Sequence, residues 1–145
     1  MRPADEGERL REIAVAAKAS WGYDLRRVRE WAALGDFSPS GLERKNAFVA
    51  LVGSDVVGWV GAIQQGGVLW LDDLWIDPEW MNRGIGSALF QHVVALGREA
   101  GALRMEWEAE PHAIGFYAKL GGRHLRDGDL ILWGRANPVM GLDLR

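Results

Sequence analysis

An apolar strand that runs through a proline turn into a glycine-punctuated helix start is the most constraining feature of this chain. The segment Val68–Ala88 reads VLWLDDLWIDPEWMNRGIGSA, in which the strand pattern ends at Pro78 and a helix begins near Gly84. The first backbone N–H groups of a helix have no partner within it and lie at the positive end of its dipole. Because Gly84 and Gly86 leave these groups uncovered, the loop predicts a seat for a phosphorylated ligand.

The composition limits the class of protein to which the chain can belong. With 145 residues, 48% of them hydrophobic, it is the size of one domain with a full core, and we expect a single domain over residues 1–145. The absence of cysteine excludes disulfides, thiolate metal sites and a cysteine nucleophile. No spacing of His, Asp and Glu suggests a metal site.

Charge and hydropathy restrict the expected partners and compartment. A net charge of −3, with both signs scattered along the chain, argues against nucleic acid as the main partner. The apolar runs are too short to span a membrane, and the first residues lack the apolar stretch of a secretory signal. We therefore expect a cytoplasmic protein without a membrane partner.

Hydrophobic periodicity predicts a mixed α/β chain. The expected elements, in chain order, are an extended start at Arg2-Pro3, helices over Glu8–Ala19 and Leu25–Leu34, strands over Asn46–Val52, Val56–Gln64 and Val68–Ile76, a helix over Gly84–Ala100, a strand over Leu103–Glu108, a helix over Ala113–Leu120, and strands over Arg123–Arg126 and Leu130–Gly134. We expect a loop at Ser38–Gly41 and a turn at Asp127–Asp129 between the last two strands.

A second motif follows the glycine loop, because Glu110–Gly122 reads EPHAIGFYAKLGG. Together the two segments resemble the signature segments of the GCN5-related N-acetyltransferase (GNAT) family, over roughly residues 57–122. The resemblance implies a mixed, mostly antiparallel central sheet with flanking helices. In that family the strands here represented by Leu69–Ile76 and Leu103–Glu108 run parallel and splay apart, and the pantetheine arm of the cofactor enters the gap.

The resemblance also implies acetyl-CoA as the acetyl donor and CoA as a product. The residues that would hold it are Leu74, Trp75 and Ile76 on the strand, Met81, Asn82, Arg83, Gly84, Ile85, Gly86 and Ser87 in the loop, and Phe116 and Tyr117 in the second motif. Two positions depart from the family pattern. Similar proteins usually have Arg or Gln at the position of Met81, and often Asn at that of Glu110.

The chemistry expected of such a protein needs an acid for the departing thiolate and a base for the attacking amine. Tyr117 occupies the tyrosine position of the second motif and is the expected acid, although packing of the short helix also explains it. Asp73 and Glu108 are the expected bases. Asp72 competes with them and is predicted to point to the face opposite Asp73, and solvent exposure or a structural hydrogen bond accounts for any of the three.

The acceptor side of the fold is expected at the loop between the first two helices. There Trp21 and Tyr23 are the expected substrate-binding residues, unless they only cap the core. The acceptor would be a small-molecule or peptide amine, and the C-terminal strands offer an edge for a homodimer. The rival reading is a non-catalytic acyl-CoA-binding sensor or interaction module. A nucleotide-phosphate binder is a third, disfavoured because the loop lacks the Lys-Ser/Thr of a P-loop.

Overall fold

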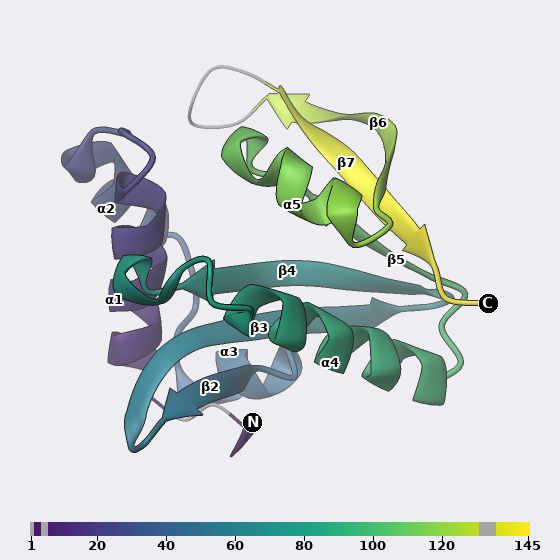
Figure 1. Ribbon diagram of the computed structural model, residues 1–145, viewed down its shortest axis with the longest axis horizontal. Helices are drawn as coiled ribbons and strands as arrows, with labels where there is room; N and C mark the ends of the chain where they lie inside the picture. The colour runs from purple at the N-terminus through teal and green to yellow at the C-terminus, as the bar shows by residue number, and fades with distance from the viewer. Residues whose placement is uncertain (1, 4–5, 131–135) are drawn as a thin grey trace.

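The computed structural model describes residues 2–3, 6–130 and 136–145 and shows an α/β architecture (Figure 1). The elements are β1 (Arg2–Pro3), α1 (Gly7–Ala19), α2 (Leu25–Ala32), α3 (Pro39–Arg44), β2 (Phe48–Val52), β3 (Asp55–Gln65), β4 (Val68–Ile76), the 3-10 turn η1 (Pro78–Trp80), α4 (Ile85–Glu99), β5 (Arg104–Glu108), the 3-10 turn η2 (Pro111–Ala113), α5 (Ile114–Lys119), β6 (Arg123–Leu130) and β7 (Ala136–Asp143).

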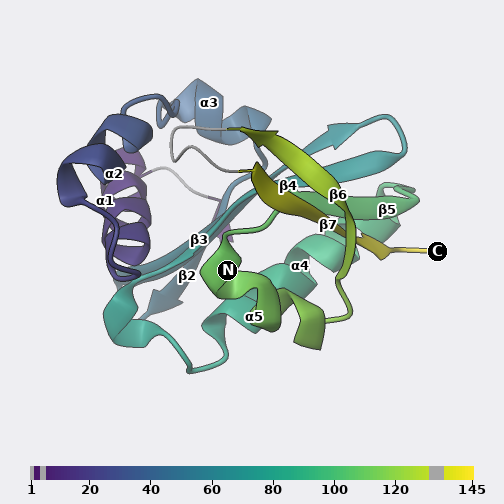
Figure 2. The same ribbon diagram turned by 90° about the horizontal axis from the view of Figure 1, so that it is seen from above.

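One sheet organises the chain, with the strand order β1-β2-β3-β4-β5-β7-β6. Every neighbouring pair of strands is antiparallel except β4 and β5, which run parallel. Figure 2 shows α1, α2 and α3 on one side of this sheet and α4 and α5 on the other. The predicted fold class, a mostly antiparallel sheet with one parallel pair and flanking helices, is confirmed.

The parallel pair separates towards its carboxyl ends, as predicted. The β4–β5 ladder contains the pairs Val68–Arg104, Leu69–Met105 and Trp70–Glu106 and ends there. Beyond Trp70, β4 continues for six residues to Ile76 while it remains paired with β3 on its other side. The β5-facing backbone groups of this segment are therefore left open to a bound molecule.

Two hydrophobic clusters hold the helices against the two faces. On one face α4 contributes Phe90 and Val93, which pack with Met105 and Trp107 of β5. On the other face Leu10 and Ile13 of α1 pack around Trp59 of β3, and the buried indole of Trp59 donates to the Leu10 carbonyl at 3.0 Å. In the described part of the chain, no helix has the length and apolar character needed to cross a membrane.

The segment expected to be a loop at Ser38–Gly41 instead begins α3. Ser38 is the N-cap, and its hydroxyl accepts a hydrogen bond from the Gly41 backbone N–H at 3.2 Å. Pro39 occupies the first helical position, where its missing N–H has no consequence. Ser38 and Pro39 thus form a helix start, because the Ser38 hydroxyl caps a free N–H group and Pro39 suits the first helical position.

The C-terminal strands also differ from the prediction. Residues 123–130 form one strand, β6, so Asp127–Asp129 is part of a strand and not a turn between two. The last strand is β7, whose residues pair with both β5 and β6. Two register shifts in the β6–β7 ladder accommodate this long pairing. The predicted strand Leu130–Gly134 falls mostly on residues 131–135, which lie outside the described residues.

Candidate active site

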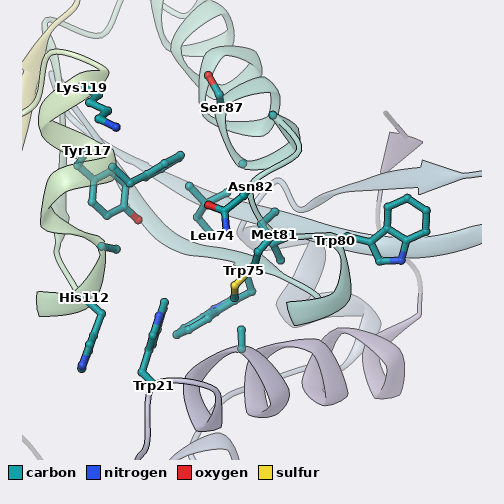
Figure 3. A pocket seen from close by; sticks show the side chains of 16 residues that line it. Trp21, Leu74, Trp75, Trp80, Met81, Asn82, Ser87, His112, Tyr117 and Lys119 are labelled. Carbon is teal, nitrogen blue, oxygen red and sulfur yellow. The ribbon is translucent and has the colours of Figure 1, made fainter.

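A cavity of about 550 Å³ opens where β4 and β5 separate (Figure 3). It lies among the carboxyl end of α1, the end of β4, the loop that leads into α4, and the η2–α5 segment. The described residues that line it are Ala17, Trp21, Leu74, Trp75, Ile76, Trp80, Met81, Asn82, Gly84, Gly86, Ser87, His112, Ala113, Phe116, Tyr117 and Lys119. Both sequence motifs therefore contribute to one site.

One end of the cavity is the amino terminus of α4. Gly84 is the N-cap residue in a left-handed conformation with φ 83°, which disfavours any side chain there. The first hydrogen bond of the helix runs from the Ala88 N–H to the Gly84 carbonyl at 3.0 Å. The N–H groups of residues 85–87 consequently have no partner within the helix.

This end fits the pyrophosphate of CoA. Apart from the chain neighbours of Gly84, no atom of the described residues lies within 4 Å of the position that a Cβ on Gly84 would occupy, so an anion can approach the backbone closely. Lys119 lines the same cavity from α5 and adds a positive charge. Oriented N–H groups, a helix dipole and a cation together match a phosphorylated ligand.

Most residues expected to hold the cofactor line the cavity. Those that do are Leu74, Trp75, Ile76, Met81, Asn82, Gly84, Gly86, Ser87, Phe116 and Tyr117. Arg83 and Ile85 are not among the lining residues. The Arg83 guanidinium lies over the Trp80 ring, 4.8 Å from its centroid, and Ile85 packs against the hydrophobic core.

Tyr117 lines the cavity from α5, between the end that carries Lys119 and the end that carries His112 (Figure 3). Its side chain is almost fully buried, with its ring 5.0 Å from the Trp107 ring and 5.1 Å from the Phe116 ring, centroid to centroid. Burial raises the pKa of the Tyr117 phenol well above its usual range, and the negative charges of Asp73 and Glu110 add to the effect. The Tyr117 phenol therefore stays protonated at neutral pH.

The predicted orientation of Asp72 is wrong, because Asp72 and Asp73 both reach the same lysine. The ammonium of Lys45 lies 2.9 Å from a carboxylate oxygen of each. The β3–β4 ladder pairs Gly61 with Asp73 but Ala62 with Leu71, so Asp72 is the extra residue of a β-bulge. A bulge interrupts the alternation of side chains, which explains why strict strand periodicity fails here.

Asp73 is the more enclosed of the two carboxylates. It accepts hydrogen bonds from the Lys45 ammonium at 2.9 Å and from the Trp75 indole at 3.3 Å. Burial raises its pKa to about 6, and the charge of Asp72 adds to that rise while Lys45 opposes it. Asp73 does not line the cavity itself, but Trp75, its hydrogen-bond donor, does.

Glu108 lies at the exposed end of β5 and is not among the described residues that line the cavity. Its carboxylate carbon is 3.4 Å from the point that a Cβ on Gly128 would occupy, so the side chain faces β6. The structure thus separates the two expected bases. Asp73 lies beside the wall of the cavity, and Glu108 lies against the C-terminal hairpin.

The other end of the cavity is walled by aromatic rings. The indole of Trp21 stacks on the imidazole of His112, with centroids 5.6 Å apart and planes 3° from parallel. Trp75 lies next to Trp21, with a centroid distance of 6.4 Å. Trp21, which is expected to bind substrate, therefore lines the cavity together with His112.

Tyr23 instead joins a buried polar cluster behind this wall. Its hydroxyl donates to the Glu110 carboxylate at 2.6 Å, and the Lys18 ammonium contacts the other oxygen of Glu110 at 3.0 Å. The His112 ring nitrogen Nδ1 lies 2.7 Å from Glu110. Burial acts to raise the pKa of Glu110, but its hydrogen bonds to Tyr23, His112 and Lys18 outweigh this and lower it.

The sequence interpretation missed Lys18 and the role of Glu110 as the centre of this cluster. A signal for Lys18 was available, since it follows Leu10, Ile13, Ala14 and Ala17 at helical spacing on the apolar face of α1. A charged residue in such a stripe requires a buried partner. That the partner would be Glu110 could not be seen from local pattern.

The chain is similar in sequence to known acetyltransferases. The sequence model of the acetyltransferase (GNAT) family matches residues 8–122. The uncharacterized N-acetyltransferase YafP of Escherichia coli is 28% identical over 82 residues, which are 56% of this chain and 52% of YafP. The matched region thus spans about half the length of that relative.

Two solved structures have the same fold over nearly the whole chain. One is the PaiA N-acetyltransferase of Thermoplasma acidophilum, crystallised with coenzyme A, which has a TM-score of 0.80 at 16% sequence identity. The superposition covers 98% of this chain and 96% of the PaiA chain. The other is a GCN5-related N-acetyltransferase of Rhodopseudomonas palustris, with a TM-score of 0.81 at 22% sequence identity. That superposition covers 99% of this chain and 96% of the other.

The fold and the family match both point to the GNAT class of acetyltransferases. The family match covers most of this chain, from α1 to the end of the second motif. The protein belongs to the GNAT acetyltransferase family.

Proposed function

We propose that this protein transfers an acetyl group from acetyl-CoA to a primary amine by direct attack, without a covalent enzyme intermediate. The observation that carries the proposal is a single cavity with an anion seat at the α4 amino terminus, the buried Tyr117 at its middle and an aromatic wall at its far end. Direct attack also agrees with the absence of cysteine from the chain.

Acetyl-CoA supplies the thioester whose carbon accepts the amine nitrogen. In the proposed reaction a C–N bond forms, the C–S bond breaks, and the products are an amide and the free thiol of CoA. The amine loses one proton and the sulfur gains one. The Tyr117 phenol donates a proton to the sulfur. The proton that the amine releases then reprotonates Tyr117.

Asp73 is the proposed base. A carboxylate with a pKa of about 6 is ionised at neutral pH yet basic enough to accept a proton through water. Asp73 also lies close enough to Tyr117 for its charge to raise the phenol's pKa, which supports a role for both groups in the same reaction. Glu108 is the alternative base. It is less favourable than Asp73 because its side chain faces β6 and is not among the described residues that line the cavity.

The test is turnover of acetyl-CoA, read as released thiol, with a panel of primary amines. We expect thiol release that depends on both the amine and the enzyme, with the acetylated amine identified by mass spectrometry. Acetyl-CoA binding without amine-dependent thiol release for any member of the panel would overturn the proposal. That outcome would favour the alternative of a non-catalytic acyl-CoA-binding module.

A further inference from the structure

The two ends of the cavity differ in chemistry. Figure 3 shows Trp21, Trp75 and His112 gathered at one end, Ser87 and Lys119 at the other, and Tyr117 between them. The end that carries the α4 amino terminus fits the phosphates of the donor. In a transfer reaction the acceptor must approach the thioester from the opposite side, so the aromatic end belongs to the acceptor.

The aromatic end is held in place from behind. Trp21 stacks on His112, and the Trp75 ring is backed by the Trp31 ring at 5.2 Å and 65°. The planes of Trp21 and Trp75 diverge by 44°. Rings fixed in this way offer a large apolar surface to a flat group, because no side chain has to be ordered when it binds.

The aromatic end has no acidic side chain that could pair with an additional positive charge on the acceptor. Among the described residues that line the cavity, none is an aspartate or a glutamate. The nearby carboxylate of Glu110 already accepts from Lys18 and Tyr23, and that of Asp73 accepts from Lys45 and Trp75. A polycationic acceptor such as an aminosugar oligomer or a polyamine would leave charges without partners here.

We infer that the acceptor is a monoamine with an aromatic ring, whose ring lies against Trp21 and Trp75 while its single amino group is directed towards Tyr117. This inference rests on the proposed function and names its substrate class. Ring contacts of this kind contribute both buried apolar area and aromatic pairing. The acceptor's chemical class is thus an arylalkylamine.

The test is a calorimetric titration of the protein saturated with CoA, which cannot react. The probes are phenethylamine, butylamine and glucosamine, each with one primary amino group. We expect phenethylamine to bind at least about tenfold more tightly than butylamine and glucosamine, because only its ring can pair with the wall. Trp21→Ala should remove most of that preference, whereas Trp70→Ala, on β4 but not among the lining residues, should keep it.

A Trp21→Leu variant controls for misfolding of Trp21→Ala, because leucine keeps much of the apolar volume but removes the stacked ring. It should show the unfolding temperature of the parent protein and a reduced preference for phenethylamine. Equal affinity for phenethylamine and butylamine, or tighter binding of glucosamine, would overturn the inference and leave acetyl transfer untouched. Preferential binding of phenethylamine without thiol release from any amine would instead overturn the proposed function, and the aromatic end would then be an arylalkylamine-binding site without transfer.

Discussion

The ammonium of Lys18 lies 3.0 Å from the carboxylate of Glu110, a residue 92 positions further along the chain. Both side chains are buried, and the Lys18 ammonium also lies over the rings of Tyr23 and Trp31, 4.8 and 5.0 Å from their centroids. This ion pair ties α1 to the residue that precedes η2. It therefore holds the aromatic end of the cavity against the segment that carries Tyr117.

Breaking this pair should destabilise the protein strongly. In Glu110→Gln the ammonium of Lys18 keeps its charge in a buried place without a counter-charge, which costs about 3–5 kcal/mol in comparable cases. The matched control is Arg123→Ala, because the Arg123–Asp143 pair at 3.1 Å is exposed and should contribute less than about 1 kcal/mol. Urea unfolding of both variants gives the two values, and similar small losses would contradict the buried-pair account.

Gly84→Asp should abolish binding of acetyl-CoA. The substitution places a carboxylate against the donor's phosphates and a Cβ on a residue with φ 83°. Gly66→Asp is the matched control, since Gly66 has φ 62° and open space around it but lies in the turn between β3 and β4. Saturating acetyl-CoA should raise the unfolding temperature of Gly66→Asp and not that of Gly84→Asp. A normal shift in a folded Gly84→Asp protein would mean that the loop is only structural.

Tyr117→Phe should separate the hydroxyl from the ring. If the phenol protonates the leaving thiolate, kcat should fall by about 10²–10⁴ while the affinity for acetyl-CoA stays nearly unchanged, because the ring still packs against Trp107. Tyr117→Ala should lower both activity and stability, since it leaves a cavity in the core. Parent-level turnover by a folded Tyr117→Phe protein would remove the acid assignment and leave water as the proton source.

The pH dependence of kcat/KM should report Asp73. A base with a pKa of about 6 is protonated below that pH, so activity falls as the pH drops through it. Ionisation of the acceptor amine adds a second dependence, so the logarithm of kcat/KM should rise with a slope of about two below pH 6 and about one above.

Two substitutions identify the group responsible. Asp73→Asn should remove the break near pH 6, and Asp72→Asn should move it to lower pH, because the Asp72 charge helps to raise the pKa of Asp73. Steady-state rates over pH 5–9 measure both effects. A break that persists in Asp73→Asn would transfer the role of base to another group, with Glu108 as the next residue to substitute.

Much of the cofactor side could be predicted from the sequence. The strand, the proline turn, the glycine N-cap and the helix are consecutive, and each depends on local preferences such as the left-handed conformation of Gly84. Tyr117 was expected in the site through the resemblance of the second motif to the GNAT family, and it does line the cavity. Trp21 was singled out by its place in the loop between the first two helices, and it also lines the cavity.

The contacts set by strand pairing were less accessible to sequence reasoning. Alternation along β4 predicted opposite directions for Asp72 and Asp73, but the bulge that brings both to Lys45 arises from pairing with β3. The strand interpretation of the C-terminus failed for a related reason. The register of β6 and β7 is set by their neighbours in the sheet and not by the turn residues within them.

By itself, the sequence determined the glycine-rich start of α4 and the order of helices and strands. Helix starts, turns and apolar stripes depend on residues only a few positions apart. Only the tertiary structure decided what surrounds the reaction centre. The Lys18–Glu110 pair, the Trp21–His112 stack and the shared contact of Asp72 and Asp73 with Lys45 each join residues far apart in the chain. Charge pairing, burial and pKa depend on such distances in space, which local periodicity does not contain.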